Sequence, residues 1–310
     1  MKIAVMGSGA VGGYYGGLLA RTGQDVTFIA RGAHLAALRK NGLEVKSVHG
    51  DFTIAPVQVT DSPAELGLVG LVMVCVKTPD TDEASQAMKP MVGPDTTVMS
   101  LQNGIDAADR IGAVVGMKNI VGGATWLSST IEAPGMIRQI SQFRRIVLGE
   151  LDGRITPRVE AVFEVLKGTG ATVELSDNIL KVLWTKFVFI ASISGVGSLT
   201  RLAIGDYRSV PETRALLVGL MREVDALASA SGIRLDADVI EQTLALIDNA
   251  APNIKPSMQR DVEASRRSEL DSMIGVIQRK GRELSVSTPT ADMVYAVLLP
   301  GELKARSGPV

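Results

Sequence analysis

The feature that most constrains the fold is a glycine-rich turn near the N-terminus, with the sequence GSGAVG. Its glycines, Gly7, Gly9 and Gly12, have the spacing G-x-G-x-x-G. An apolar run at 3–6 precedes the turn, and a helical segment of small residues separates it from a second apolar run at 26–30. This order of strand, turn, helix and strand is that of a dinucleotide-binding unit. The alternative is a glycine turn in another kind of α/β unit.

Each glycine has a role in such a unit. The first allows the tight turn, the second lets the backbone approach a pyrophosphate, and the third lets the helix pack closely on the strand. The helix N-terminus then faces the negative charge of the cofactor. We therefore expect the cofactor to be bound by the whole turn, that is by Gly7, Ser8, Gly9, Ala10, Val11 and Gly12.

The end of the second apolar run indicates which dinucleotide is bound. An acidic residue at this position accepts hydrogen bonds from the ribose hydroxyls of NAD, whereas the chain has Arg31 here and no acidic residue before Glu44. A guanidinium group suits the 2′-phosphate of NADP. We expect NADP(H); the alternative is an arginine that is simply solvated at the end of a strand.

Composition excludes several classes of protein. The 310 residues suffice for two domains, 46% of them are hydrophobic and 21% are charged, and the formal net charge is −1. This balance does not favour a nucleic-acid or membrane-surface partner. Cys75 is the one cysteine, which excludes an internal disulfide and fits a reducing compartment. We expect a cytoplasmic protein, with no membrane span in the short apolar run 182–193, and no metal site.

The order of elements predicts an α/β class fold: an N-terminal Rossmann-type dinucleotide-binding domain, then an all-α C-terminal domain. Segments 43–48 and 52–59 are expected to form a hairpin, and 124–150 to add antiparallel strands. After the strand 172–175 only helical patterns remain, so we place the boundary at residue 176, giving domains 1–176 and 177–310. The expected helices of the second domain are 178–194, 211–231, 236–250, 257–284 and 289–298, followed by a loose tail from 301 to 310.

Two buried strands in the first domain are expected to end in polar residues. The run 71–76 leads to Lys77, and the run 97–101 leads to Asn103. Ligands bind at the carboxyl ends of parallel strands in open α/β sheets. Lys77 and Asn103 are therefore expected on the same side as the glycine turn.

The second domain must supply a proton donor if the cofactor transfers a hydride to a carbonyl group. Lys186 lies in the first helix among Val182, Leu183, Phe187 and Ile190. Burial there lowers the pKa of a lysine toward working pH, which suits a general acid. The alternative is a lysine that extends its ammonium group to water along an apolar surface.

A later segment carries Ser257 and Glu269, twelve residues apart in the sequence. On one continuous helix they would be about three turns apart and on nearly the same face. The physical pattern does not distinguish Glu269 from the other charged residues of this segment.

Taken together, these motifs resemble those of the ketopantoate reductase (2-dehydropantoate 2-reductase) family along nearly the full chain. The matching segments are GSGAVG, Arg31, VCVKT with Lys77, SLQNG with Asn103, WTK with Lys186, and SMQRDVEASRRSELD with Ser257 and Glu269.

The resemblance implies an NADPH-dependent reduction of ketopantoate to (R)-pantoate, a step of pantothenate biosynthesis, with the substrate in the cleft between the domains. It implies that Lys186 is the general acid and that Glu269 holds the substrate or the nicotinamide ribose. Asn103 and Ser257 would bind substrate and cofactor, Lys77 would line the nicotinamide end, and the backbone near Ser128 would touch the cofactor.

One departure concerns substrate binding. The family has asparagines at three positions where this chain has Ile190, Ser194 and Ile204. An isoleucine cannot form the hydrogen bonds of an asparagine, so an unpaired substrate hydroxyl at Ile190 would cost about 1–3 kcal/mol. Ile190 and Ser194 are still expected to line the substrate site.

Three functions follow as alternatives. The first is an NADPH-dependent oxidoreductase that reduces the keto group of a 2-oxo acid to a CH–OH group, with ketopantoate as the default substrate and Ser257 or Lys255 orienting its carboxylate. The second keeps this chemistry with a more apolar 2-oxo acid. The third is a non-catalytic NADP(H)-binding sensor, which the presence of Lys186 and Glu269 disfavours. The apolar helical faces predict a homodimer.

Overall fold

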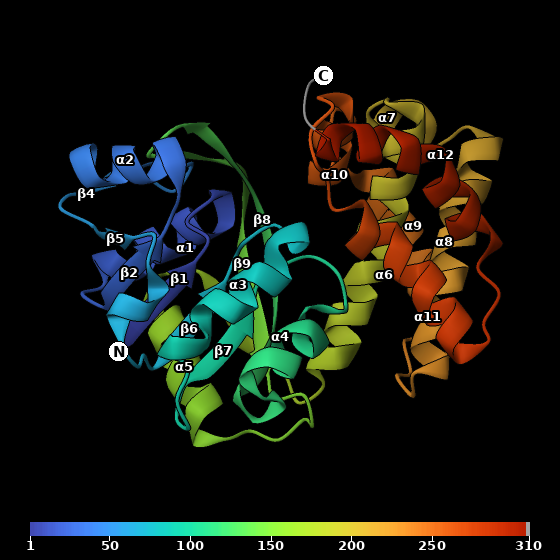
Figure 1. Ribbon diagram of the computed structural model, residues 1–310. Helices are drawn as coiled ribbons and strands as arrows, with labels where there is room; N and C mark the ends of the chain where they lie inside the picture. Colours follow the sequence, from blue (N-terminus) through green and yellow to red (C-terminus); the bar gives the residue numbers. More distant parts are fainter. Residues whose placement is uncertain (308–310) are drawn as a thin grey trace. The chain divides into compact units, whose positions relative to one another are not determined.

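The computed structural model describes residues 1–307, which form two compact units (Figure 1). The α/β unit comprises Met1–Gln102 and Ala107–Ile179, and the helical unit comprises Asn103–Asp106 and the chain from Leu180 onward. Ile179 belongs to the α/β unit because its side chain packs on Gly122 and Gly149. Ile105 packs against the core of the helical unit. A division at 176 remains our prediction from sequence, whereas the contacts divide the chain after Ile179.

The α/β unit is built on one sheet whose strands follow the order β4-β3-β9-β8-β7-β6-β1-β2-β5, with β10 beside β9. The run β5-β2-β1-β6-β7-β8 is parallel throughout, and β8 and β9 form a long antiparallel pair. The strands are β1 Lys2–Met6, β2 Asp25–Ile29, β3 Leu43–Lys46, β4 Phe52–Ile54, β5 Gln58–Thr60, β6 Leu71–Val74, β7 Thr97–Ser100, β8 Ile120–Ala133, β9 Met136–Gly149 and β10 Thr172–Leu175.

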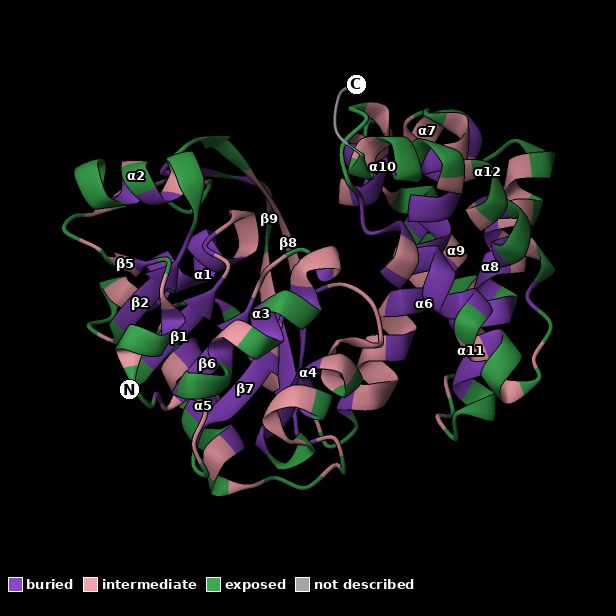
Figure 2. Ribbon diagram, in the orientation of Figure 1, coloured by how far each residue is buried: buried purple, intermediate pink, exposed green. Residues whose placement is uncertain are grey.

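Helices cover both faces of this sheet, as its buried strands require. The helices are α1 Ala10–Arg21, α2 Gly32–Asn41, α3 Thr81–Met88, α4 Ala107–Val115 and α5 Pro157–Lys167, with short 3-10 turns η1 Pro63–Leu66, η2 Thr78–Asp80, η3 Lys89–Met91 and η4 Met117–Asn119. Along β1, Ile3 and Val5 join the core under α1 and α5, whereas Ala4 and Met6 join the core under α3 and α4. Figure 2 shows the buried strands between these helices. The predicted Rossmann-type fold is confirmed, and from Ile179 to Ser307 the only regular elements are helices.

The helical unit packs around α6, the longest helix among the described residues. Its elements are α6 Ile179–Thr200, α7 Ile204–Tyr207, α8 Pro211–Ala230, α9 Val239–Asn249, α10 Ser257–Glu263, the π-helix η5 Asp271–Gly275, α11 Val276–Leu284 and α12 Pro289–Arg306. At 22 residues and a mean hydropathy of 1.6, α6 could span a membrane by length and composition. However, 56% of its apolar window is buried, as in a core helix (Figure 2). The helix is thus longer than the apolar run 182–193 predicted from the sequence, so its length alone does not exclude a membrane span.

Several boundaries differ from the sequence prediction, and the helix expected at 178–194 continues to Thr200. The strand expected at 52–59 is two strands, because β4 pairs with β3 whereas β5 pairs with β2 in another part of the sheet. The helix expected at 257–284 ends at Glu263, and Ser265 takes a left-handed conformation with φ 51°. The tail expected from 301 is helical to Arg306, since α12 continues through Pro300; its last three residues, 308–310, lie outside the described part.

Candidate active site

The glycine turn lies between β1 and α1 and is packed too closely for side chains. Gly7 has φ 93°, and a Cβ atom there would lie 2.7 Å from the backbone nitrogen of Val76. A Cβ atom on Gly12 would lie 2.1 Å from the carbonyl oxygen of Gly7. At Gly9, in contrast, the nearest atom would be Cδ1 of Ile131 at 3.9 Å. The turn therefore has two positions that need glycine for packing and one that leaves the backbone open for a ligand.

Ser8 is held by the neighbouring strand. Its backbone N–H and its hydroxyl both donate to the carbonyl oxygen of Ile29, at 3.1 and 3.0 Å. His34 contributes a second link, with Nε2 2.8 Å from the carbonyl oxygen of Ser8 and Nδ1 3.1 Å from the backbone nitrogen of Gly135. The backbone N–H of Gly135 can only donate, so Nε2 carries the proton of a neutral imidazole. His34, which sequence analysis did not assign to the site, thus fixes the glycine turn to the β8–β9 hairpin.

Arg31 follows β2 and is the residue before the first turn of α2. Its guanidinium group pairs with Glu83 of α3 at 2.7 Å, with 62% and 64% of the two side chains exposed. The hydrogen bond that Arg31 donates to the Glu83 carboxylate raises the pKa of Arg31 above its usual value. An exposed pair of this kind contributes little to stability, so Arg31 can exchange Glu83 for a phosphate at small cost.

Lys77 is exposed on the segment after β6 and directly precedes η2. The segment is held by Gln102, whose amide donates to the carbonyl oxygen of Val76 at 2.9 Å and to Oγ1 of Thr81 at 2.8 Å. Because β1 pairs with both β2 and β6, the α/β unit brings Lys77, Arg31 and the glycine turn to one edge of the sheet. The amide of Gln102 was missed as a positioning group, and only its place in the polar tip QNG could have indicated it.

Ser128 lies in β8 beside a register shift between Leu127 and Ser129. Its backbone N–H donates to the hydroxyl of Ser141 in β9 at 3.0 Å. This N–H group is therefore already used within the hairpin. A backbone contact from Ser128 to the cofactor remains a prediction that would depend on its carbonyl group or on a rearrangement.

The helical unit brings together Lys186, Asn103 and Glu269. The ammonium group of Lys186 donates to Oδ1 of Asn103 at 2.9 Å. Burial lowers the pKa of Lys186 to about 8, against a smaller, opposing effect of the Glu269 carboxylate, which favours the charged form. Glu269 is 8% exposed. The arrangement holds a protonated amine that can release its proton near neutral pH, which is what a general acid requires.

Asn103 follows β7 but belongs to the helical unit with Gly104, Ile105 and Asp106. A Cβ atom on Gly104 would lie 3.2 Å from the carbonyl oxygen of Ser272. The segment is thus packed closely against the residues that follow Glu269. Sequence analysis placed Asn103 at a strand tip of the first domain, and its hydrogen bond to Lys186 could not be foreseen.

The three positions that lack the family asparagines have different surroundings. Ile190 is half-buried at the edge of the helical core, and Ile204 is fully buried in that core. Ser194 is 1% exposed, and its hydroxyl has no hydrogen-bond partner among the described residues. Ser194 therefore has an unused polar group in the interior, one helical turn from Ile190.

Ser257 is half-buried in the first turn of α10. It is separated from Glu269 by the left-handed Ser265, so the predicted shared helical face does not exist and was wrong. Lys255 is paired with Glu263 at 2.8 Å and donates to the carbonyl oxygen of Arg201. Those contacts occupy the ammonium group of Lys255 and leave Ser257 as the better of the two candidates for contact with a carboxylate.

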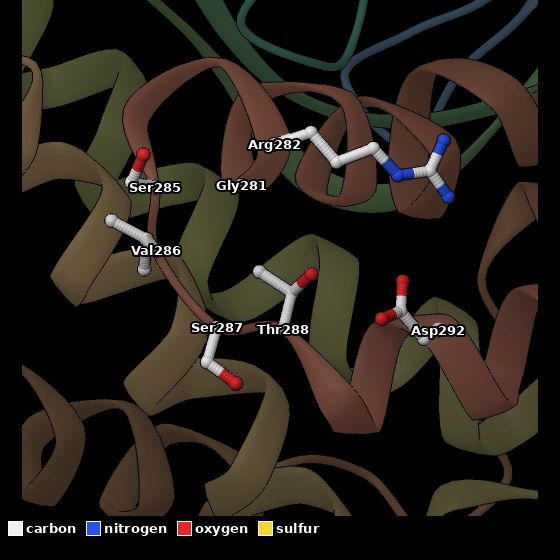
Figure 3. Close-up of a pocket in the computed structure, with 7 residues that line it drawn as sticks. All are labelled: Gly281, Arg282, Ser285, Val286, Ser287, Thr288 and Asp292. Atoms are coloured by element: carbon white, nitrogen blue, oxygen red, sulfur yellow. The ribbon is translucent and has the colours of Figure 1, made fainter.

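A shallow depression of about 370 Å³ lies elsewhere in the helical unit (Figure 3). Its lining comes from α11, the following loop and the start of α12: Gly281, Arg282, Ser285, Val286, Ser287, Thr288 and Asp292. The depression contains none of the predicted site residues.

Comparison with known proteins covers both units. The model of the family "Ketopantoate reductase PanE/ApbA" matches residues 3–153, and that of its C-terminal part matches residues 178–302. A 2-dehydropantoate 2-reductase of Mesorhizobium japonicum is 30% identical, over 96% of this chain and 97% of its own length.

Solved structures of similar proteins have the same fold. A PanE/ApbA family ketopantoate reductase from Ralstonia eutropha has a TM-score of 0.90 at 30% identity, covering 99% of this chain and 100% of its own. D-mandelate dehydrogenase, solved with NADH and anilino(oxo)acetate, shares the fold with a TM-score of 0.89 at 24% identity, over 99% of both chains. The chain belongs to the ketopantoate reductase family, whose members are nicotinamide-dependent oxidoreductases acting on a CH–OH group.

Proposed function

We propose that this protein reduces a 2-oxo acid with NADPH and that Lys186 is the general acid. The observation that carries the proposal is the environment of Lys186, which is partly buried, donates to Asn103 and is influenced by the charge of Glu269. A lysine that merely extended to solvent would keep a pKa close to its usual value. The pKa of about 8 matches a group that donates a proton near neutral pH.

The residues of the α/β unit fit NADPH. The open backbone at Gly9 suits a pyrophosphate at the first turn of α1, and the exposed guanidinium of Arg31 suits the 2′-phosphate. The ammonium group of Lys77 adds a positive charge at the same edge of the sheet. When bound, NADPH would supply the hydride that reduces the keto carbon.

The proton required by the reduced oxygen would come from Lys186. As the keto carbon gains a hydride, its oxygen gains negative charge, and the Lys186 ammonium donates a proton to form the hydroxyl group. Lys186 is left as a neutral amine and regains its proton from solvent. The Asn103 amide holds the lysine, and the Glu269 carboxylate favours its charged form before transfer. The half-buried Ser257 would bind a substrate oxygen with its hydroxyl group, whereas the buried Ser194 would do so only after the helical unit opens around it.

The named relatives support ketopantoate as the first substrate to test. Ile190 favours a second candidate, a 2-oxo acid without a hydroxyl group at the corresponding position. An unpaired hydroxyl costs about 1–3 kcal/mol, which corresponds to roughly fivefold to a hundredfold in kcat/KM.

A matched pair of substrates tests both candidates. Ketopantoate and 2-oxo-3,3-dimethylbutanoate differ only by the terminal hydroxyl, and NADPH oxidation can be followed optically with each. If Ile190 lines the site, the deoxy compound should be the better substrate, and Ile190→Asn should shift the ratio of kcat/KM values toward ketopantoate. An unchanged ratio in that variant would remove Ile190 from the substrate site. NADPH binding without turnover of these or other 2-oxo acids would instead favour a sensor.

The cytoplasmic location and the homodimer also belong to this proposal. The exposed apolar side chains of α12, Met293, Val297 and Leu303, are 40%, 59% and 51% exposed and support self-association. Light scattering on the purified protein would give the oligomeric state.

A further inference from the structure

The segment that carries Glu269 is attached to the last turns of α12. On the N-terminal side of Glu269, the backbone N–H and the hydroxyl of Ser268 donate to Oε2 of Glu302 at 3.0 and 2.6 Å. Glu302 is 4% exposed, so its carboxylate is directed into the protein. The residue immediately before Glu269 is therefore held by two hydrogen bonds to one buried carboxylate.

The C-terminal side of Glu269 is held by the same helix. Arg306 Nε donates to Oε1 of Glu302 at 3.0 Å, and the guanidinium group also pairs with the carboxylate of Asp271. The hydroxyl of Tyr295, also on α12, donates to the other oxygen of Asp271. Arg306 thus contacts both Glu302, which binds Ser268 before Glu269, and Asp271, which follows Glu269 by two residues.

Glu269 does not lie within an α-helix. The residue lies between the left-handed Ser265 and the π-helix η5, so no continuous α-helix includes it. Its carbonyl oxygen accepts from the backbone N–H of Met273 at 2.9 Å. π-Helical turns often occur where a side chain must be directed to a functional site.

We propose that Glu302 and Arg306 form a clamp that positions Glu269 beside Lys186. The proposal rests on the role of Glu269 in the proposed function. Both clamp residues act through the main chain around Glu269 and are positioning residues, since neither is placed against a reacting atom. Because α12 is the last helix among residues 1–307, the C-terminal region would then be required for the chemistry.

The pH at which kcat falls on the alkaline side should show whether the clamp is intact. The charge of Glu269 favours the protonated form of Lys186, so a displaced Glu269 should lower the pKa of Lys186 below about 8. Reduction requires the protonated lysine, and its rate falls as the pH rises through that pKa. Loss of the clamp should therefore move the fall in kcat to lower pH.

The test compares Arg306→Ala with Arg214→Ala. Arg214 forms a bidentate pair with Asp248 at 2.8 and 2.9 Å in the same unit, and both arginine side chains are 34% exposed. Arg306→Ala should lower kcat by roughly tenfold to a hundredfold. The pH at which kcat falls on the alkaline side should also become lower, while NADPH affinity changes less than about twofold. Arg306→Lys should restore part of the rate, and Glu302→Gln should act in the same direction. Arg214→Ala should change neither kcat nor the pH at which kcat falls.

A double-mutant cycle with Glu269→Gln separates the possible failures. If the clamp acts through Glu269, adding Arg306→Ala to Glu269→Gln should cost less than about twofold more. The clamp alone would be overturned if Arg306→Ala lowered kcat as much in the Glu269→Gln background as in the wild type. It would also be overturned if Arg214→Ala shifted the pH dependence of kcat as much as Arg306→Ala does. A Glu269→Gln variant with wild-type rate and pH profile would overturn both the clamp and the role of Glu269 in the proposed function.

Discussion

The two units hold their candidate site residues by different physical means. In the α/β unit the site is mostly backbone, since Gly7 and Gly12 leave no room for a Cβ atom and Gly9 leaves the chain open. In the helical unit the site is a set of side chains, with Lys186 bonded to Asn103 and influenced by Glu269. A site made of backbone groups depends on the spacing of residues along the chain. A site made of titratable side chains depends on burial and on partners that are distant in the sequence. Substitutions in the two units should therefore separate cofactor affinity from chemistry.

The largest effect is expected for Lys186→Ala. Loss of the general acid should lower kcat by roughly a hundredfold to ten-thousandfold, and NADPH affinity should stay nearly unchanged because the cofactor residues lie in the other unit. Steady-state NADPH oxidation and a fluorescence titration measure the two quantities. Lys181→Ala is the matched control, because Lys181 lies on α6 and pairs with Asp236 at 2.7 Å. Normal turnover in Lys186→Ala would remove the lysine from the mechanism.

Two glycine substitutions should separate folding from binding within the α/β unit. An alanine at Gly12 would clash with the backbone of Gly7, so the free energy of unfolding should fall by about 1–3 kcal/mol or more. An alanine at Gly9 meets no atom within 3.9 Å and should cost at most about 1 kcal/mol, yet its methyl group should obstruct the pyrophosphate. Urea denaturation and NADPH titration of both variants test this contrast. Equal effects on stability would contradict it.

Arg31→Ala should affect one cofactor selectively. Removing charge-assisted hydrogen bonds to the 2′-phosphate should weaken NADPH by roughly tenfold to a hundredfold and leave NADH affinity nearly unchanged. Glu83→Gln is the control, because it breaks the same ion pair while keeping the guanidinium group. That variant should keep NADPH affinity and lose at most about 1 kcal/mol of stability. Equal losses of NADPH and NADH in Arg31→Ala would refute the cofactor assignment.

The smallest effect concerns His34, which ties the glycine turn to the β8–β9 hairpin. Burial lowers the pKa of His34 below 6.5, against a smaller effect of its bond to Ser8. The neutral imidazole therefore contributes stability that is complete above pH 6.5 and is lost as the pH falls through the folded-state pKa. The slope should not exceed about 1.4 kcal/mol per pH unit, the value for one proton. Urea denaturation between pH 7 and 5 should show a weaker dependence in His34→Gln than in His49→Gln; identical curves would contradict this assignment.

Much of the α/β unit could be predicted because its signals are local. The spacing of Gly7, Gly9 and Gly12 and the apolar runs beside them indicate β1, α1 and β2 almost to the residue. The position of Lys77 after a buried strand follows from the same logic. The division of the segment 52–59 could not be foreseen, because β5 pairs with β2 and not with its neighbour in sequence. Strand pairing is decided by contacts between distant residues.

In the helical unit, the sequence pattern did not predict the break in the segment that carries Glu269. Helical periodicity extends across 257–284, yet the chain turns at Ser265 and re-enters a helix through η5. Periodicity does not report a left-handed residue, and it could not reveal that Glu302 and Arg306 hold the segment between these elements.

The sequence by itself determined the fold class, the glycine turn, Arg31 and the apolar surroundings of Lys186, since each depends on residue type and short-range spacing. The tertiary structure alone decided that Asn103 joins the helical unit as the partner of Lys186, that His34 links the turn to a hairpin, and that α12 holds the segment of Glu269. These contacts join residues 26 to 101 positions apart in the chain. Only packing brings such residues together, because hydrogen bonding and pKa depend on distances in space.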